Sequence, residues 1–252
     1  MEIRARTAVV TGGAHGIGRA IARRLAADGA SVLVADLDKA GGRDLAAELG
    51  AAGTEAVSVA VDVTVDAEVT RMVETAVGKL GGIDILVNNA GGYDEPIFPD
   101  APIAHWTRAL DLNLRAVMLA IHAAVPVMEA RGGGAIVNIA SSAGLGFAPY
   151  AGPEYAAAKA AVIRLTASLA WLADRGVRVN CVCPHTVATE TVRRTIAELE
   201  AAGRPLPGPL RDELLEPEEV AEHVATFVGD DELAGRVLVC RGGEPPRLLP
   251  VG

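Results

Sequence analysis

The sequence predicts an α/β protein built on a doubly wound parallel sheet of about seven strands, with helices on both faces. Short apolar runs alternate with longer stretches of helical periodicity along the chain. Several runs, such as residues 83–87 and 135–139, are almost continuously apolar, as in strands that helices cover on both faces. Residues 1–252 are expected to form one domain, because α/β folds of this length often do.

Each expected element rests on its own local pattern. Strands are expected at residues 6–11, 31–36, 55–61, 83–88, 134–140, 177–183 and 236–240. Helices are expected at residues 16–28, 38–50, 66–80, 102–129, 153–174 and 217–228. Pro153 suits the first turn of its helix, where its missing N–H costs little. Residues 203–209 are rich in Pro and Gly, so neither regular helix nor sheet is expected there.

Composition argues against two classes of binding site. The formal net charge of −9 argues against a nucleic-acid partner, because the phosphates would be repelled. The five histidines are scattered through the chain. No cluster of Cys, His and carboxylate residues in the sequence has the spacing of metal ligands. We therefore expect neither nucleic acid nor a metal ion as a partner.

Neither a leader nor a membrane span is expected. Residues 1–6 are charged and the first apolar run is short, unlike a signal peptide. The most apolar helical stretch, residues 109–128, is interrupted by Asp111, Asn113 and Arg115. The three cysteines are typical of reduced thiols in a long chain, which favours a cytoplasmic protein.

A glycine-rich turn follows the first expected strand. Residues 12–18 read Gly-Gly-Ala-His-Gly-Ile-Gly and lead into a helix. Glycines let the backbone approach phosphates, and the helix N-terminus offers free N–H groups and a positive dipole end. The spacing is Gly-x-x-x-Gly-x-Gly rather than Gly-x-Gly-x-x-Gly. With Asp36 ending the next strand, the unit predicts a dinucleotide site; the alternative is a structural turn and an exposed acid.

Tyr155 and Lys159 are four residues apart, so on a helix they share one face. Free tyrosine has a pKa of about 10, and a nearby ammonium lowers that pKa. Such a pair could give and take a proton near neutral pH. Ser142 could hydrogen-bond a substrate oxygen. Taken alone, the pair could equally be an exposed Tyr and Lys.

Motifs along nearly the whole chain, in order and with family spacing, resemble the classical short-chain dehydrogenases/reductases. The matching residues are Thr11, Gly12 to Gly18, Asp62, Val63, Asn88, Asn89, Ala90, Gly91, Asn113, Ser142, Tyr155, Lys159, Asn180 and residues 184–189. The resemblance implies a Rossmann sheet and an NAD-dependent oxidoreductase that interconverts a secondary alcohol with a ketone or aldehyde. It also implies that about residues 186–215 cover the substrate, with an ordinary surface loop as the alternative.

The resemblance implies a catalytic role for four residues. Tyr155 would donate or accept the substrate proton, and Lys159 would lower the pKa of Tyr155 and hold the nicotinamide ribose. Ser142 would orient the substrate oxygen, with Ser141 as its structural neighbour. Asn113 would open a kink in its helix and hold a water for proton relay to Lys159; the alternative is a hydrogen-bonded core Asn.

The resemblance also implies a set of cofactor-binding residues. They are Gly12, His15, Gly16, Ile17, Gly18, Asp36, Asp62, Val63, Asn89, Ala90, Gly91, Tyr155, Lys159, Pro184, Val187 and Thr189. Asp62 would bond the adenine, or be an exposed loop acid. Thr189 would contact the nicotinamide carboxamide, or cap a helix. Asn88 and Asn89 would contact the cofactor, or pin neighbouring strands.

Asp36 predicts NAD rather than NADP as the cofactor. A carboxylate at the end of the second strand can accept hydrogen bonds from both adenosine ribose hydroxyls. A 2′-phosphate at that place would meet like charge and lose those bonds. Leu37 and Asp38 follow Asp36, so no basic side chain flanks it closely there.

Two positions depart from the family pattern. His185 stands where the family usually has glycine, so the turn could survive, the pocket could change, or the side chain could face solvent. Arg241 stands where the family often has Asp, and a change in subunit contacts is expected. The expected pocket side chains are mostly apolar and include Leu145, Phe147, Tyr150, Val187 and Leu206. They favour a moderately hydrophobic secondary alcohol or ketone as substrate.

Three alternatives to this function stay open. One is an NADP-preferring carbonyl reductase, and another is a 3-oxoacyl reductase acting on a carrier-bound substrate. The carrier would need a basic patch, which Arg193, Arg194, Arg204 and Arg211 permit. From a different class, a non-catalytic dinucleotide-sensing protein could keep the fold without turnover.

Two expected helices lack a polar stripe for water. Residues 155–173 and 117–128 are apolar almost all round. A helix that covers one outer face of a single sheet should show a polar side to solvent. We therefore expect a homo-oligomer, a dimer or tetramer, in which these helices form an interface.

Overall fold

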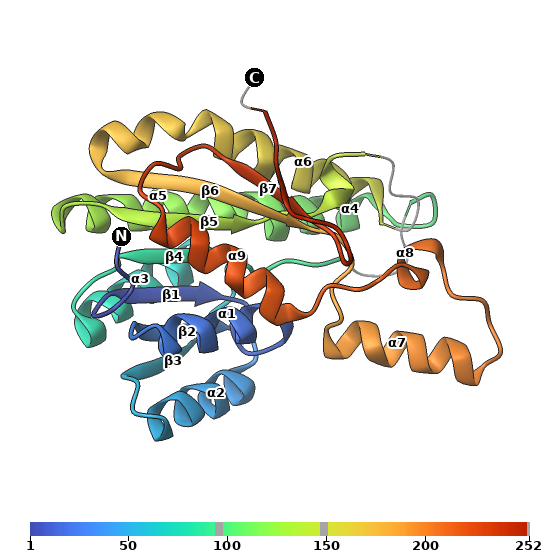
Figure 1. Ribbon diagram of the computed structural model, residues 1–252, viewed down its shortest axis with the longest axis horizontal. Coiled ribbons are helices and arrows are strands. Elements are labelled where there is room, and N and C mark those ends of the chain that lie inside the picture. The colour runs from blue at the N-terminus through green and yellow to red at the C-terminus, as the bar shows by residue number, and fades with distance from the viewer. Residues whose placement is uncertain (94–97, 147–150, 251–252) are drawn as a thin grey trace.

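The fold is one twisted sheet with helices on both faces (Figure 1). The computed structural model describes residues 1–93, 98–146 and 151–250. The strand order is β3-β2-β1-β4-β5-β6-β7-β8. The strands are β1 Thr7–Thr11, β2 Ser31–Asp36, β3 Ala56–Ala60, β4 Ile85–Asn88, β5 Gly134–Ile139, β6 Val177–Pro184, β7 Val237–Cys240 and β8 Arg247–Leu248. The first seven pair in parallel, which confirms the predicted fold class.

An eighth strand was not predicted. Two residues of β8 pair antiparallel with β7 at the edge of the sheet. Both residues are exposed, so the segment has no alternation of apolar and polar side chains from which a strand could be predicted. Because β8 runs antiparallel to β7, the turn that joins them lies at the carboxyl end of the sheet, where Arg241 and Glu244 line the cleft described below.

The helices divide between the two faces of the sheet. They are α1 Gly16–Ala27, α2 Lys39–Ala51, α3 Asp66–Leu80, α4 Ile103–Leu110, α5 Ala116–Ala130, α6 Pro153–Ser168, α7 Glu190–Ala201, α8 Gly208–Arg211 and α9 Pro217–Gly229, with a π-helical turn η1 Asp111–Arg115 and 3-10 turns η2 Ser142–Gly144 and η3 Ala170–Arg175. One apolar cluster joins α1, α2 and α9 to the sheet. A second joins α3, α5 and α6 to the other face.

The strands are apolar because each of them contributes side chains to both apolar clusters. In β1, Val10 belongs to the first cluster and Val9 to the second. In β2, Val34 and Leu33 divide in the same way. Alternate side chains point to opposite faces, and full burial of one such side chain contributes about 1.5–3 kcal/mol. A covering helix on each face therefore requires unbroken apolar runs.

The helix expected at residues 102–129 is interrupted by the π-helical turn η1. The Asn113 amide Nδ2 donates to the carbonyl of Ala109, at 3.0 Å, within this stretch. The whole stretch, Ile103–Ala130, is long and apolar enough to span a membrane by length and composition, although core helices pass the same test. Ala120 and Ala124 of this stretch pack in the core cluster on the sheet.

The helix α7 was not predicted. All of its residues are described and none is buried. The helix therefore has no buried apolar face whose spacing in the sequence would have predicted it. Thr189 caps it by accepting from Val192 N–H at 3.4 Å, which is the capping role considered for that residue. Gly208 and Pro209 begin α8, so the expectation of an irregular segment is wrong for these two residues. Proline is tolerated there because it lies in the first turn.

The turn between β1 and α1 depends on a backbone contact that only glycine permits. A Cβ on Gly18 would lie 2.0 Å from the carbonyl oxygen of Gly12. Gly12 itself has a φ of 60°, which L side chains rarely adopt. Asn89 Nδ2 secures the turn by donating to the carbonyls of Thr11 and Gly12, at 3.0 and 2.9 Å. These bonds join the end of β4 to the end of β1, as the strand-pinning role considered for Asn89 requires.

We predict that Gly18→Ala lowers stability and loosens this turn. The added methyl group meets backbone rather than a movable side chain, and overpacking of this kind costs about 1–3 kcal/mol. Thermal or urea unfolding measures the loss. The matched control is Gly78→Ala in α3, where a Cβ meets nothing within 4 Å. That control should gain about 0.5–1 kcal/mol, and equal stability of the two variants would contradict the assignment.

Candidate active site

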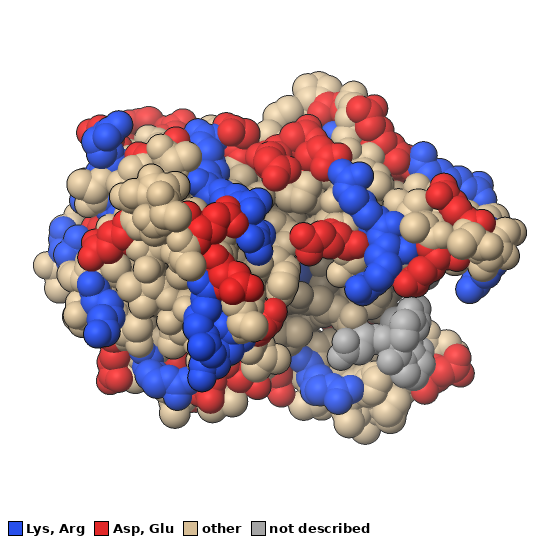
Figure 2. All heavy atoms as spheres, turned by 90° about the horizontal axis from the view of Figure 1, so that it is seen from below, with Lys and Arg blue, Asp and Glu red and all other residues tan. Residues whose placement is uncertain are grey.

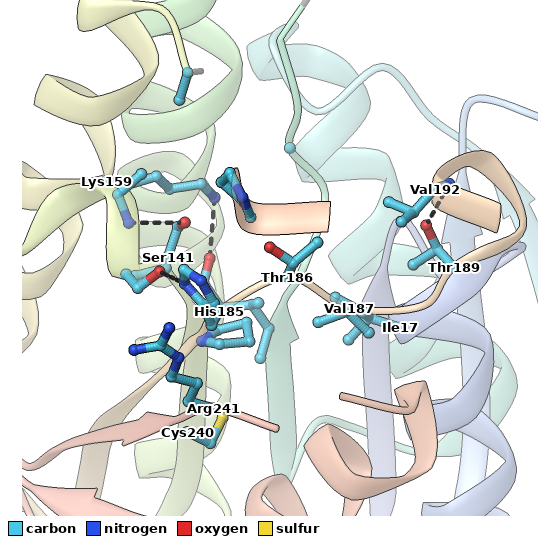
Figure 3. Close-up of a pocket in the computed structure, with 18 of the residues that line it drawn as sticks. Ile17, Ser141, Lys159, His185, Thr186, Val187, Thr189, Val192, Cys240 and Arg241 are labelled. Atoms are coloured by element: carbon cyan, nitrogen blue, oxygen red, sulfur yellow. Dashed lines mark hydrogen bonds between the residues drawn. The ribbon is translucent and has the colours of Figure 1, made fainter. Parts of the chain in front are cut away.

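A cleft of about 1270 Å³ lies at the carboxyl ends of the parallel strands. The glycine turn lines one part of it, the ends of β4, β5 and β6 line the middle, and residues after α7 and β7 complete it. Figure 3 shows Ile17, Val187 and Thr189 towards one end and Lys159, Ser141, His185 and Arg241 towards the other. Open parallel sheets bind ligands at this edge.

Thirteen of the predicted site residues line this cleft. They are Gly12, His15, Gly16, Ile17, Asn89, Ala90, Gly91, Ser142, Tyr155, Lys159, Pro184, Val187 and Thr189. Gly18 lies behind the turn against Gly12, and Asn113 is buried behind Gly91. Asp36, Asp62 and Val63 are not among the residues that line the cleft.

The glycine turn fits a pyrophosphate. The N-cap residue of α1, His15, makes no side-chain capping hydrogen bond. Its Nε2 lies instead 2.8 Å from Asp38 Oδ2. The first N–H groups of α1 therefore have no side-chain cap, and a helix N-terminus of this kind attracts anions. The backbone around Gly12 and Gly16 lines the cleft directly.

Asp36 is fixed at the end of β2 by two backbone hydrogen bonds. Its Oδ2 accepts from Ala14 N–H and its Oδ1 from Asp38 N–H, both at 2.9 Å. These bonds connect Asp36 to the glycine turn. The hydrogen bond from His15, followed by one from the Gly41 backbone, lowers the pKa of Asp38. Two carboxylates therefore stand at the end of β2, where a phosphate would meet like charge.

Asp62 and Val63 are occupied by local structure. Asp62 Oδ1 accepts from the N–H and the hydroxyl of Thr64, at 2.9 and 2.7 Å, and so closes the turn before α3. Val63 is buried in the core cluster on the α3 face. The adenine contact predicted for Asp62 remains a prediction.

Tyr155 and Lys159 lie together on α6, as their spacing predicts. The Lys159 ammonium donates to the carbonyl of Ile139 at 3.0 Å and lies 5.6 Å from the centre of the Tyr155 ring. Burial lowers the pKa of Lys159 to about 8. Burial also raises the pKa of Tyr155 to about 12, and a hydrogen bond with Ser141 opposes this only in part. The expected lowering of the Tyr155 pKa is therefore wrong for the protein without its cofactor, because desolvation of the phenolate outweighs the hydrogen bond with Ser141.

Asn113 is completely buried and its amide is engaged. Oδ1 accepts from Gly92 N–H at 2.9 Å, and Nδ2 donates to the carbonyls of Gly92 and Ala109, at 2.7 and 3.0 Å. A Cβ on Gly91 would lie 2.8 Å from Asn113 Oδ1 and 3.0 Å from Lys159 Nζ. Glycine at position 91 thus lets the loop after β4 pass between these two polar groups.

The two serines have different partners. Ser141 Oγ accepts from Ala143 N–H at 3.1 Å and caps η2. Ser142 Oγ lies 2.8 Å from His185 Nδ1. Among residues 1–93, 98–146 and 151–250, Ala5 is the only non-glycine residue with positive φ, so His185 requires no left-handed backbone. Its side chain turns into the cleft, which is one of the three outcomes considered for this position.

The far end of the cleft is more polar than predicted. Asp212, Arg241, Glu244 and Arg247 line it, together with His185. Arg241 reaches Asp212 Oδ2 at 2.9 Å, so this departure from the family pattern faces the cleft. Of the expected apolar residues, Val187 lines the cleft but Leu145 and Leu206 do not. Phe147 and Tyr150 lie outside the described residues.

One aromatic contact at the site was not predicted, whereas the reduced thiols were. The Tyr93 ring lies 5.1 Å from that of Tyr155, and only its closeness to the Asn89–Gly91 motif could have suggested this. Cys181 and Cys183 are buried free thiols on β6. Among the described residues, no group of three or more His, Cys, Asp or Glu side chains could hold a metal ion.

Comparison with known proteins identifies the family. A sequence model for short chain dehydrogenases matches residues 6–200. Cis-4-hydroxycyclohexanecarboxylate dehydrogenase of Sinomonas cyclohexanicum is 39% identical over 251 residues, covering 94% of this chain and 96% of that protein. Cyclohexanol dehydrogenase of Acinetobacter sp. (strain SE19) is 38% identical over 229 residues, covering 90% and 88% respectively.

Solved structures agree with the sequence comparisons. A 7α-hydroxysteroid dehydrogenase complexed with NADH and 7-oxo glycochenodeoxycholic acid superimposes with a TM-score of 0.85 and 30% identity, covering 96% of each chain. A short-chain type dehydrogenase/reductase from Mycobacterium marinum also gives 0.85, with 31% identity, again covering 96% of each chain. Sequence and structure together show that the chain belongs to the short-chain dehydrogenase/reductase family and is an oxidoreductase.

Proposed function

We propose that the protein is an NAD-preferring dehydrogenase that interconverts an alicyclic secondary alcohol and its ketone. The observation that carries this proposal is the position of Ser142, Tyr155 and Lys159 in the same cleft as the glycine turn. The relatives named above are dehydrogenases of ring alcohols, which supports a ring-bearing substrate. Cytoplasmic location and a single domain over residues 1–252 are part of the proposal.

Different residues of the cleft would bind different parts of NAD. The turn from Gly12 to Gly18 would hold the pyrophosphate, and Asp36 the adenosine ribose. Asn89, Ala90 and Gly91 would flank the cofactor with their backbone. Lys159, with Pro184, Val187 and Thr189, would face the nicotinamide end, and residues 186–215 would cover the substrate. When bound, the nicotinamide supplies the hydride chemistry.

Tyr155 would carry the proton. With its pKa raised to about 12, Tyr155 is protonated at neutral pH and can donate to the oxygen of a ketone. In the reverse direction, the phenolate form of Tyr155 would take the hydroxyl proton of the alcohol. Lys159, with a pKa of about 8, is mostly charged below that pH and would stabilise the phenolate formed when Tyr155 gives up its proton. Ser142 would bind the same substrate oxygen.

The alternatives find less support. Arg193 pairs with Glu216 at 2.6 Å and Arg194 with Glu198 at 3.8 Å, so acidic neighbours offset part of the basic patch that a carrier would need. Figure 2 shows basic and acidic side chains mixed over the face that it presents, which does not favour nucleic acid. A sensing protein would not require Asn113, Ser142, Tyr155 and Lys159 together.

We predict a preference for NAD over NADP of at least about tenfold in kcat/KM, because the 2′-phosphate would meet the Asp36 and Asp38 carboxylates. Steady-state rates with both cofactors measure it. Asp36→Ser should reduce the ratio of kcat/KM with NAD to kcat/KM with NADP. The control Asp44→Asn on the outer side of α2 should leave this ratio unchanged. Comparable kcat/KM values in the wild type would refute the cofactor assignment.

We predict that Tyr155→Phe reduces turnover by at least about 10²-fold, the low end for loss of a general acid–base group, while NAD binding is largely kept. The substitution removes one oxygen and retains the ring. Lys159→Ala should weaken both turnover and NAD binding. Turnover of a secondary-alcohol panel and NAD titration separate the two effects, and near-normal activity of Tyr155→Phe would overturn the mechanism.

We also infer a homo-oligomer, either a dimer or a tetramer. On the α5 and α6 side of the sheet, Met118 is 49% exposed and Trp171 in η3 is 53% exposed. A second copy of the chain would cover these apolar side chains through a two-fold interface.

Light scattering at micromolar concentration should therefore give at least twice the chain mass of 25.9 kDa. Met118→Glu should shift the protein towards the monomer, because a charge would be buried in the interface. The control is Val77→Glu on α3, which should leave the mass unchanged. A fully active wild-type monomer would contradict the inference.

A further inference from the structure

Four side chains form a connected line along one side of the cleft. Ser142 Oγ lies 2.8 Å from His185 Nδ1, and His185 Nε2 lies 3.3 Å from Asp212 Oδ2. Arg241 then donates to the same Asp212 oxygen at 2.9 Å. Figure 3 shows His185 on the same side of the pocket as Ser141 and Arg241. The two positions that depart from the family pattern, His185 and Arg241, thus meet through Asp212.

The line of contacts fixes which imidazole nitrogen carries a proton. The hydrogen bond from Arg241, and then that from His185, lowers the pKa of Asp212, so its carboxylate is ionised and can only accept. His185 Nε2 must therefore carry a hydrogen. In the neutral ring Nδ1 is then an acceptor, and the hydroxyl of Ser142 donates to it. In the imidazolium, Nδ1–H donates to Ser142 instead.

The hydroxyl of Ser142 has a single hydrogen. When His185 is neutral, that hydrogen is used, and Ser142 offers the substrate oxygen only lone pairs. The hydroxyl hydrogen of an alcohol cannot bond them, because Tyr155 takes that hydrogen. When His185 is protonated, Ser142 accepts from His185 and can donate its own hydrogen to the substrate oxygen, in the ketone and in the alcohol alike. Resting on the function proposed above, we propose that His185 is a positioning residue whose protonation frees the hydrogen of Ser142 to bind the substrate oxygen.

The proton balance needs no additional reactant. In ketone reduction Tyr155 transfers its proton to the substrate oxygen, while Ser142 and His185 keep theirs and supply hydrogen bonds only. The cofactor supplies the hydride, as in the proposed reaction. His185 therefore changes the polarity of the oxygen-binding site without being consumed or regenerated in the cycle.

Charged or titratable groups on several elements face this part of the cleft. They are Tyr155 and Lys159 on α6, Glu190 on α7, Asp212 after α8, Cys240 on β7, Arg241 and Glu244 after β7, and Arg247 on β8. Asp212 is the only one of these in hydrogen-bond contact with the His185 ring among the described residues.

The test compares wild type with His185→Gln in both directions, using an alicyclic alcohol with NAD and the matching ketone with NADH. In the wild type, kcat/KM for reduction should fall at least about tenfold between about pH 6 and pH 8, the range in which histidine titrates. His185→Gln can bond Ser142 but does not titrate, so the fall in kcat/KM below about pH 7 should be lost. The fall near pH 8 that the titration of Lys159 causes should stay. The control His223→Gln on α9 should keep both.

Asp212→Asn sharpens the test. Loss of the carboxylate disfavours the imidazolium, so the fall in kcat/KM for reduction should move to lower pH, and the contribution of His185 to the oxidation profile should move in the same sense. A purely structural role for His185 would lower kcat/KM in both directions while leaving the shape of the pH profile unchanged. Profiles of the same shape in wild type and His185→Gln would overturn the proposal.

A measurement without turnover separates this proposal from the proposed function. Nitrogen-15 NMR of the imidazole rings, with His185→Gln for assignment, reports the tautomer directly. At about pH 8 the neutral His185 ring should carry its hydrogen on Nε2, and the Nδ1 signal should shift in Ser142→Ala. An Nδ1–H tautomer would overturn the proposal. Absence of wild-type turnover over a wide substrate panel would instead count against the proposed function.

Discussion

The buried ammonium of Lys159 constrains the arrangement of the whole site. The side chain is 3% exposed, and a charge so far from water is costly unless it is hydrogen-bonded. The carbonyl of Ile139, at the end of β5, supplies one bond at 3.0 Å. The loop after β4 passes so closely that a Cβ on Gly91 would lie 3.0 Å from Nζ. The requirement to satisfy one cation thus draws α6, β5 and the loop after β4 together.

Hydrogen bonds between buried polar side chains hold β4, β5 and α6 in register. Asn88 Nδ2 donates to Asn138 Oδ1 at 2.8 Å, and Asn138 Nδ2 donates to Thr166 on α6 at 3.0 Å. Each of these amides is buried and partnered, so the bonds specify one arrangement of β4, β5 and α6. The site residues on these elements therefore keep their relative positions without relying on the loops that cover the cleft.

Much of this arrangement could be predicted from the sequence, because its determinants are local. The first seven strands follow from apolar runs, and the glycine turn and the Tyr155–Lys159 pair follow from spacing along a single turn or helix. The line from Ser142 to Arg241 could not be predicted in this way. Its partners come from four separate loops, and only the tertiary fold brings His185 to Asp212 and Arg241.

Other differences have equally physical causes. The π-helical turn at Asn113 depends on hydrogen bonds to Gly92, a partner from outside its own helix. The helix α7 has no buried face, so its pattern carries no core signal. The pKa of Tyr155 was expected to fall because only the neighbouring Lys159 could be seen in the sequence. The depth of burial, which raises it to about 12, is a property of the folded chain.

The protonation of Lys159 tests most directly the claim that burial governs the chemistry of this site. NMR of the labelled lysine side chains, with Lys159→Met to assign the signal, would give its titration in the folded protein without cofactor. The account predicts a midpoint near a pKa of about 8, well below the ordinary lysine value of 10.5. A midpoint at the ordinary value would show that the ammonium is solvated, and would contradict the buried site on which the account depends.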